Sequence, residues 1–516
     1  MNFKSTLIRI LSIVTVAALL LSASGCGESK SGKKKVIKRV IITEESSEEN
    51  ITDISSEQQT SFDSDGNDGQ DVTVDSSGTQ TGPRRELYQK EETVKYTETF
   101  KPEFVYEYTE WDGPDGYKIV YSDKTEYAYT SAKRLQDYFL ENYNVTLDIV
   151  KDTQPGQEKE IVVGDTSRYK TSLPENEFAV ILYGEKLIFE GGHFAMVEKA
   201  ADWFMSVKPE KEKAVILSGR ASDFKSSLDG GYKYVWGDEF DGTGLDYYKW
   251  QFGREFMAGT PKLYIAPAAE AEEKKIMTVE DGRMKITAQR YFNELIKDAE
   301  YATSEFSSYD KMGFLYGYAE IRARLPMFKG AWPSWWMTTA YCQDMFPEGY
   351  KYETVPYRIE VDIFEVFSSK TDVVPNFHKW WDAANKNNFI MPESMHSVYP
   401  SDKISHYVYD LNENISNEYH IYGLKWTPEE ITMSVDGEDY MTFDLKDGFD
   451  GENEYNEFLQ QPLCMVFTNY LYVDDLTSTS TAGKLIDPEN LPAEFFIDYI
   501  RLYQIPGEGK LWTADI

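Results

Sequence analysis

Cysteine and histidine are scarce in this chain of 516 residues, which contains three Cys and five His. Cys26, Cys342 and Cys464 lie far apart, and this spacing excludes a disulfide framework. The sequence contains no CxxC pair, no HExxH motif and no cluster of Cys and His. It therefore offers no motif for a zinc site.

Basic residues are outnumbered, because 53 Lys and Arg stand against 88 Asp and Glu and give a formal net charge of −35. Such a polyanion repels nucleic acid, so we exclude nucleic acid as a partner. A neutral polymer is a compatible partner. Aromatic residues are abundant by contrast, at 15% of the chain. Most of them are expected in the core and on strand surfaces, and a minority can stack on sugar rings.

Long apolar runs are also missing, with one short exception at residues 11–21. This run is too short for a membrane-spanning helix, follows a basic start and precedes small residues, so residues 1–25 are predicted to be a secretory signal. The segment Ala23-Ser24-Gly25-Cys26 resembles a bacterial lipobox, although Ala23 stands where Leu is usual. The resemblance implies that Cys26 is lipidated and that the protein is an extracellular, cell-surface lipoprotein.

Residues 26–98 are predicted to be a lipid anchor followed by a disordered acidic linker. Lys and Arg between residues 30 and 39 suit attraction to anionic headgroups. From residue 44 to about residue 95 the chain is rich in Glu, Asp, Ser, Thr, Gly and Gln and shows no apolar periodicity. Such a composition cannot bury a core and predicts a self-repelling tether.

Residues 99–228 alternate strand and helix signals, which predicts a small α/β domain. The phrases "IVVGDTS" (161–167) and "LIFEGG" (187–192) resemble the small α/β domain that precedes the catalytic barrel in some α-glucuronidases and β-hexosaminidases. A spacer role and a carbohydrate-binding role are both open.

Residues 229–507 read as short strands separated by turns, among them "MKITAQ", "YRIEVDIFEV" and "FFIDYIRLYQ". Asp436-Gly437 marks a hairpin turn, because this pair supplies residues with positive φ. No helical period longer than two turns appears. An all-β sandwich is predicted here, followed by a tail at residues 508–516.

One predicted strand carries three carboxylates, Glu360, Asp362 and Glu365. Side chains on a strand alternate between faces, so Glu360 and Asp362 share one face and their apolar neighbours share the other. Strict alternation would bury Glu365 among the apolar residues, at a cost of several kcal/mol. A β-bulge near Ile363-Phe364 would return Glu365 to the face of the other two. The sequence therefore predicts three carboxylates in a row.

Three readings of this row are open: a solvated acidic face, a calcium site and a catalytic site. A solvated face would tolerate Lys or Thr in the mixture, and calcium more often draws on loop oxygens. Closely spaced carboxylates repel one another, and this repulsion raises the pKa of at least one of them. Two carboxyl groups in different protonation states are what glycoside hydrolysis requires.

The wider sequence resembles glycoside hydrolase family 16. "EVDIFE" matches the ExDxxE motif of that family in its β-bulged form, and further pieces match in order. These pieces are "WGDEFDGTGLDYYKW" (236–250), "YGYAEIRARLPMFKGAWPSWWM" (316–337), "YHIYGLKWTPEEITMSVDG" (419–437) and "FFIDYIRLYQ" (495–504). The resemblance implies a β-jelly-roll sandwich with an open cleft, and a retaining endo-acting enzyme. It assigns Glu360 as nucleophile, Glu365 as acid/base and Asp362 as the residue between them that tunes both.

The resemblance also implies binding residues. Trp332 and Trp336 match positions that line the donor side of the cleft, and the alternative is that both lie in the core; Trp335 has the opposite parity and is expected in the core. His378 matches a position at which family members place a hydrogen-bonding histidine, the alternative being a plain loop histidine. No cofactor is required, but Glu239 and Asp498 match positions near a structural calcium in some members, the alternative being a surface acid and a strand-end cap. We expect a monomer.

The lichenases of this family have the shorter ExDxE motif and a Trp two residues before the nucleophile. This chain has the bulged motif and Arg358 at that position, so the resemblance favours the laminarinase-like branch, which acts on β-1,3-glucan. An agar- or carrageenan-type galactan hydrolase has the same motif and is the alternative, as is a non-catalytic cell-surface glycan-binding protein. A sulfated galactan would call for Arg or Lys in the cleft. Arg322 and Arg324 share the parity of Glu320, and on that ground both can face the cleft.

Overall fold

The computed structural model describes most of the chain from residue 103 onward. The described ranges are 39–40, 103–124, 126–170, 172–208, 213–220, 224–252, 262–294, 296–340, 357–368, 372–381, 396–397, 409–410, 418–445, 461–473 and 485–513. The predicted signal, the lipidation site Cys26 and the acidic linker lie outside these residues, as does Cys342. No helix in the described part is long and apolar enough to cross a membrane.

The region predicted as a small α/β domain contains one mixed sheet and two helices, as expected. Its elements are β2 (Glu103–Glu110), β3 (Lys118–Tyr121), α2 (Glu126–Tyr143), β4 (Ile149–Lys151), β5 (Glu160–Val163), β6 (Glu177–Tyr183), β7 (Lys186–Gly191), α3 (Phe194–Val207) and β8 (Lys213–Arg220). A further strand of this sheet, β1 (Arg39–Val40), pairs with β2 and lies within residues 26–98, the segment predicted as lipid anchor and disordered linker. The strand order is β1-β2-β8-β6-β7-β5-β3-β4. Helix α2 buries the apolar positions that its 3.6-residue period places on one side, namely Ala128, Ala132, Leu135 and Phe139.

The sheet that carries the three-carboxylate strand follows the order β10-β15-β26-β18-β19-β20-β21, with three further strands, β16, β22 and β28, paired at its margins. Its strands are β10 (Gln251–Phe252), β15 (Glu305–Ser307), β16 (Met312–Leu315), β18 (Ala331–Thr339), β19 (Tyr357–Glu365), β20 (Asp372–Trp381), β21 (His396–Ser397), β22 (Tyr409–Asp410), β26 (Leu463–Leu471) and β28 (Lys510–Thr513). Strand β28 corrects the predicted tail at residues 508–516, because its backbone pairs with β16.

The opposite sheet follows the order β11-β14-β13-β27-β17-β23-β24-β25, with β12 and β9 paired at its sides. Its strands are β9 (Lys233–Asp238), β11 (Leu263–Ile265), β12 (Met277–Glu280), β13 (Arg283–Arg290), β14 (Tyr301–Thr303), β17 (Gly317–Arg324), β23 (His420–Trp426), β24 (Glu430–Val435), β25 (Glu438–Asp444) and β27 (Ala493–Gln504). Asp436 and Gly437 both have positive φ, which is the predicted turn between β24 and β25. One short helix, α4 (Ala268–Glu273), lies between β11 and β12.

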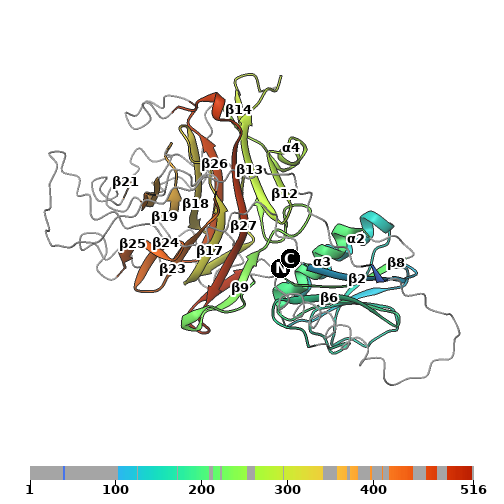
Figure 1. Cartoon of the computed structure of the whole chain (residues 1–516). Coiled ribbons are helices and arrows are strands. Elements are labelled where there is room, and N and C mark those ends of the chain that lie inside the picture. The colour runs from blue at the N-terminus through green and yellow to red at the C-terminus, as the bar shows by residue number, and fades with distance from the viewer. Residues whose placement is uncertain are drawn as a thin grey trace, which may run out of the picture. The chain divides into compact units, whose positions relative to one another are not determined.

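The two sheets lie face to face, with β18, β19 and β26 in one layer and β13, β27 and β17 in the other (Figure 1). A large apolar cluster with residues from both sheets lies between them, and a smaller one that also draws on both sheets lies beside it. Trp335 and Phe467 stack in the large cluster with ring centroids 6.2 Å apart. This is the predicted all-β sandwich, and Trp335 lies in its core as expected.

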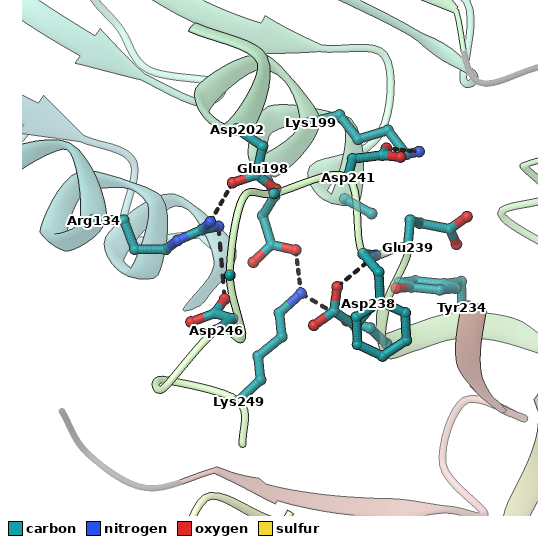
Figure 2. Close-up of a pocket in the computed structure, with 15 residues that line it drawn as sticks. Arg134, Glu198, Lys199, Asp202, Tyr234, Asp238, Glu239, Asp241, Asp246 and Lys249 are labelled. Atoms are coloured by element: carbon teal, nitrogen blue, oxygen red, sulfur yellow. Dashed lines mark hydrogen bonds and ion pairs between the residues drawn. The ribbon is translucent and has the colours of Figure 1, made fainter. Parts of the chain in front are cut away.

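The α/β region and the sandwich belong to one compact unit, which includes residues 94–516. Tyr234 of β9 and Tyr503 of β27 are members of the apolar cluster that fills the α/β region. Beside them lies a cavity lined by charged side chains from α2, from α3 and from the loop after β9 (Figure 2). Its charged residues are Arg134, Glu198, Lys199, Asp202, Asp238, Glu239, Asp241, Asp246 and Lys249.

Candidate active site

Strand β19 contains the predicted β-bulge. Against β18, Trp335 is opposite Phe364 and Trp336 is opposite Asp362, so Ile363 is the additional residue. Against β20 the register also shifts by one residue between Asp362 and Glu365. The bulge therefore lies at Ile363-Phe364, where the sequence placed it.

The bulge sorts the side chains of β19 between two environments. Ile359, Val361, Ile363, Phe364 and Val366 are all buried in the apolar cluster between the sheets. Ile363 and Phe364 are consecutive in the chain and yet both belong to that cluster, which a regular strand would not permit. The register change returns Glu365 to the parity of Glu360 and Asp362, on the outer face of the sheet.

The three carboxylates form the middle of three rows that cross the sheet from β18 to β20. The rows are Thr338–Glu360–His378, Trp336–Asp362–Asn376 and Ser334–Glu365–Val374. The three carboxylates differ in burial: Glu360 is half-buried, whereas Asp362 is 2% and Glu365 is 9% exposed. Glu360 is thus the carboxylate with the greatest access to solvent.

The carboxylate of Glu365 accepts a hydrogen bond from the indole of Trp332, with 2.9 Å between Nε1 and Oε1. The indole stacks on Tyr472, with ring centroids 4.9 Å apart and an angle of 9° between the rings. Burial raises the pKa of Tyr472, and the negative charge of Glu365 raises it further, so this phenol stays neutral at physiological pH. Sequence reasoning assigned Trp332 to sugar stacking and gave no signal for Tyr472.

A side chain of the opposite sheet is hydrogen-bonded to the backbone of the bulge. The hydroxyl of Tyr440 on β25 donates a hydrogen bond to the carbonyl oxygen of Ile363. Because the additional residue of a bulge interrupts the strand ladder, its carbonyl benefits from a partner outside the ladder. Tyr440 was not predicted as a site residue, because nothing in the local sequence connects it to a strand 77 positions away.

The other two predicted substrate-binding residues, Trp336 and His378, both lie in rows with the carboxylates. Trp336 lies on the same face as Asp362 but is only 6% exposed, and it packs against Tyr309, Cys464 and Val466. The backbone of His378 is opposite Glu360, and its side chain lies outside the described residues. Asn376 was missed, although its position two residues before His378 on β20 gives it the same parity.

Arg322 and Arg324 do not face the carboxylates, contrary to the expectation from parity. Both lie on β17 in the opposite sheet, and their strand neighbours Ala319, Ile321 and Ala323 occupy the core. Their guanidinium groups lie over Tyr419 and Phe496. Parity separates the two faces of one strand, but it does not say which of two sheets carries that strand.

Glu239 and Asp498, the positions matched to calcium, each bind an arginine. The guanidinium of Arg501 donates to both oxygens of Glu239 at 2.7 and 2.8 Å, and Arg322 donates to Asp498 at 2.5 Å. Burial by itself would raise the pKa of Glu239, but Arg501 holds it below its usual value. Among the residues that the structure describes, no group of three or more His, Cys, Asp or Glu could hold a metal ion. The two carboxylates therefore do not fit a shared calcium site.

The arrangement of carboxylates suits acid/base and nucleophilic chemistry on a neutral substrate. Three acids occupy successive rows, one of them half-buried and one held by an indole donor. Two neighbouring carboxyl groups in different surroundings can differ in protonation, which lets one attack while the other donates a proton.

Comparison of the sequence with known proteins places this site in a family context. Residues 268–484 match the model of glycosyl hydrolases family 16. A beta-glucanase of Rhodothermus marinus is 28% identical over 282 residues, which cover 53% of this chain and 85% of that protein. A glucan endo-1,3-beta-glucosidase A1 of Niallia circulans is 23% identical over 290 residues, which cover 53% of this chain and 38% of that protein. The predicted resemblance to this family is thereby confirmed.

Among solved structures, the laminarinase from Rhodothermus marinus is 26% identical. The similarity covers 53% of this chain and 97% of that one, with a TM-score of 0.40.

Proposed function

We propose that this chain is a glycoside hydrolase that cleaves β-1,3-glucan internally with retention of configuration, because its residues 268–484 match the model of glycosyl hydrolases family 16. The observation that carries the proposal is the register of β19, which aligns Glu360, Asp362 and Glu365 on one outer face. The match to family 16 includes this strand.

The proposed reaction has two steps. In the first, the carboxylate of Glu360 forms a bond to the anomeric carbon while Glu365 transfers its proton to the glycosidic oxygen, whose bond to that carbon breaks. In the second, Glu365 takes a proton from water, and the oxygen of that water displaces Glu360 from the anomeric carbon. Two inversions at one carbon give net retention, and Asp362 stabilises the differing protonation of its neighbours.

The substrate assignment rests on the relatives and on charge. The two relatives described above are named as a beta-glucanase and a glucan endo-1,3-beta-glucosidase, and Arg322 and Arg324 lie on the sheet opposite the carboxylates. A kappa-carrageenase of Pseudoalteromonas carrageenovora is also similar, at 26% identity over 255 residues. This relative keeps a galactan as the competing substrate. His378 and Trp336 are proposed to contact the sugar chain near the carboxylates.

Proton NMR during digestion of laminarin tests the reaction. We expect β-anomeric reducing ends to appear first and to mutarotate later. A first product in the α-configuration would contradict retention. Binding of a long oligosaccharide without any product would instead favour the glycan-binding alternative.

A substrate panel tests the linkage. Laminarin, lichenan, agarose, porphyran and carrageenan are incubated with the wild-type protein, and new reducing ends are measured. We expect laminarin to be cleaved fastest. Preferred cleavage of any galactan would reject the β-1,3-glucan assignment and leave the catalytic carboxylates as proposed.

We also propose that the protein is exported, lipidated at Cys26 and held at the cell surface as a monomer on a flexible tether. The support is the apolar run, the lipobox-like segment and the acidic linker. Phase partitioning in a nonionic detergent tests it: the wild type is expected in the detergent phase and Cys26→Ala in the aqueous phase. If both proteins stay in the aqueous phase, the anchor is wrong.

A further inference from the structure

The hydrogen bond between Trp332 and Glu365 joins a side chain expected to stack on sugar to the proposed acid/base. The indole Nε1 lies 2.9 Å from Oε1 of Glu365. An indole N–H can donate a hydrogen bond but cannot accept one, so the direction of this bond is fixed. Glu365 is 9% exposed, and at such burial a hydrogen bond to the carboxylate acts with little competition from water.

The position of the indole is fixed by its surroundings. One of its faces is covered by Tyr472, and the ring of Tyr470 meets it at 84°. The backbone N–H of Tyr472 donates to the carbonyl of Gly330 at 2.9 Å. Gly330 has a φ of 96°, and a Cβ there would lie 2.1 Å from the Cα of Ile486, so only glycine allows this close approach.

The residues that follow Glu365 are hydrogen-bonded to β18, the strand that carries Trp332. The N–H of Val366 donates to the carbonyl of Pro333 at 3.1 Å, and the N–H of Ser368 donates to the carbonyl of Ala331 at 3.0 Å. These two bonds flank Trp332 on β18. Donor and acceptor are therefore held by the same pair of backbone segments, which limits the freedom of the bond between them.

We propose that Trp332 is a positioning residue that fixes the carboxyl group of Glu365 and directs its transferable proton to Oε2. The proposal rests on the proposed function. Because Oε1 already accepts the indole hydrogen, the neutral carboxyl group carries its own proton on the other oxygen. Rotation of the carboxyl group that exchanges the two oxygens would break the bond to Trp332. One oxygen thus serves orientation and the other serves proton transfer.

The same bond favours the ionised form of Glu365, since a donor stabilises the charged carboxylate more than the neutral acid. Burial and the neighbouring carboxylates act in the opposite direction. Removal of the indole hydrogen should therefore make Glu365 a weaker acid. The covered face of Trp332 also leaves at most one face of its indole for a sugar ring.

The pH dependence of kcat/KM on laminarin tests the proposal with Trp332→Phe, which keeps an aromatic ring against Tyr472 and removes the donor. The alkaline limb reports the loss of the proton from the acid catalyst. We expect this limb to move to higher pH by about one unit, as loss of a hydrogen bond to a charged group implies. We also expect kcat on laminarin to fall, and to fall less on an aryl β-laminaribioside whose dinitrophenolate leaving group needs no proton.

Tyr472→Phe is the matched control, because it preserves both the ring stack and the indole donor, and its alkaline limb should move less than that of Trp332→Phe. Equal limbs in Trp332→Phe and wild type would overturn the proposal. If Trp332→Phe does not fold, 3-benzothienylalanine at position 332 keeps the fused ring without the N–H, and the same criterion applies. A wild-type protein inactive on all β-glucans and galactans would contradict the proposed function itself.

Discussion

Glu360 and Glu365 have different surroundings although they lie on one strand. Glu360 is half-buried and is opposite Thr338 and His378, whereas Glu365 is nearly buried and accepts a hydrogen bond from Trp332. Such a difference allows two identical side chains to take different roles. The more accessible carboxylate is the proposed nucleophile, and the enclosed one is the proposed acid/base.

Substitution of each carboxylate should produce a different loss. Glu360→Ala is expected to abolish turnover of every substrate, because no covalent intermediate can form. Glu365→Ala should lower kcat on laminarin by about 10²–10⁴-fold but spare an activated aryl glycoside, and azide should restore its turnover. Glu430→Ala removes a carboxylate on β24 that pairs with Lys425 and serves as control. Equal losses on both substrates in Glu365→Ala would contradict its role.

Chelation should leave the stability of the protein unchanged, because Glu239 is already neutralised by Arg501 and Asp498 by Arg322. We expect the same melting temperature in EDTA and in calcium chloride. Arg501→Met, in contrast, leaves Glu239 buried without its partner and should cost about 3–5 kcal/mol in the free energy of unfolding. Stabilisation of the wild type by calcium would show that cation binding rearranges these pairs.

At the scale of a single element, the bulge in β19 is the feature on which the site depends. A one-residue change of register reverses the faces of all following side chains, so loss of the bulge would turn Glu365 into the core. The hydroxyl of Tyr440 reaches the bulge from β25 and donates to the carbonyl of Ile363. Strand β25 therefore takes part in the geometry of a site on the other sheet.

Tyr440→Phe should destabilise the bulge by about 1–3 kcal/mol, the cost of leaving a buried acceptor without its donor. The expected results are a lower urea midpoint and a lower kcat on laminarin. Tyr264→Phe is the matched control, since its hydroxyl donates to Glu270 of α4 and no bulge is involved. If both variants lose equal stability and keep full kcat, the hydroxyl of Tyr440 does not support the site.

At the scale of the whole molecule, charged side chains join the α/β region to the sandwich. Lys249, which follows β9, donates to Glu198 of α3 at 2.6 Å and to the carbonyl of Gly237 at 2.7 Å (Figure 2). Lys199 pairs with Asp241 in the same cavity. Carboxylates outnumber cationic groups in its lining, and burial there raises the pKa of Glu198 to about 8 and that of Asp241 to about 6.

This junction predicts a dependence of stability on pH. The ordinary pKa of a glutamate is 4.5, so between pH 4.5 and about 8 the unfolded chain releases the proton that folded Glu198 keeps. Stability should therefore fall as pH rises through this window, by at most about 1.4 kcal/mol per pH unit for one group. Glu198→Gln should flatten the decline in urea-unfolding experiments between pH 5 and pH 8, and Glu273→Gln, at an exposed position of α4, should not. Parallel profiles for wild type and Glu198→Gln would contradict this origin.

The sequence alone determined the features that depend on neighbours along the chain. Helix α2 follows from apolar residues at helical spacing, the β24–β25 turn from Asp436-Gly437, and the bulge from the need to keep Glu365 out of the core. Alternation along one strand, interrupted by that bulge, was enough to align the three carboxylates. The family resemblance also came from local sequence, because its motifs are runs of consecutive residues.

Only the tertiary structure decided which strands lie beside one another and which sheet carries each face. Arg322 and Arg324 belong to the opposite sheet, and β28 completes a sheet from the predicted tail. Tyr472, which follows β26, and Tyr440 of β25 reach the site from positions far along the chain. The ion pairs of Glu239 with Arg501 and of Asp498 with Arg322 could not be predicted from the sequence either. Pairing between distant strands is chosen by packing of the whole core and leaves no periodic signal in either segment, so the partners of a site residue become visible only when the sheets are assembled.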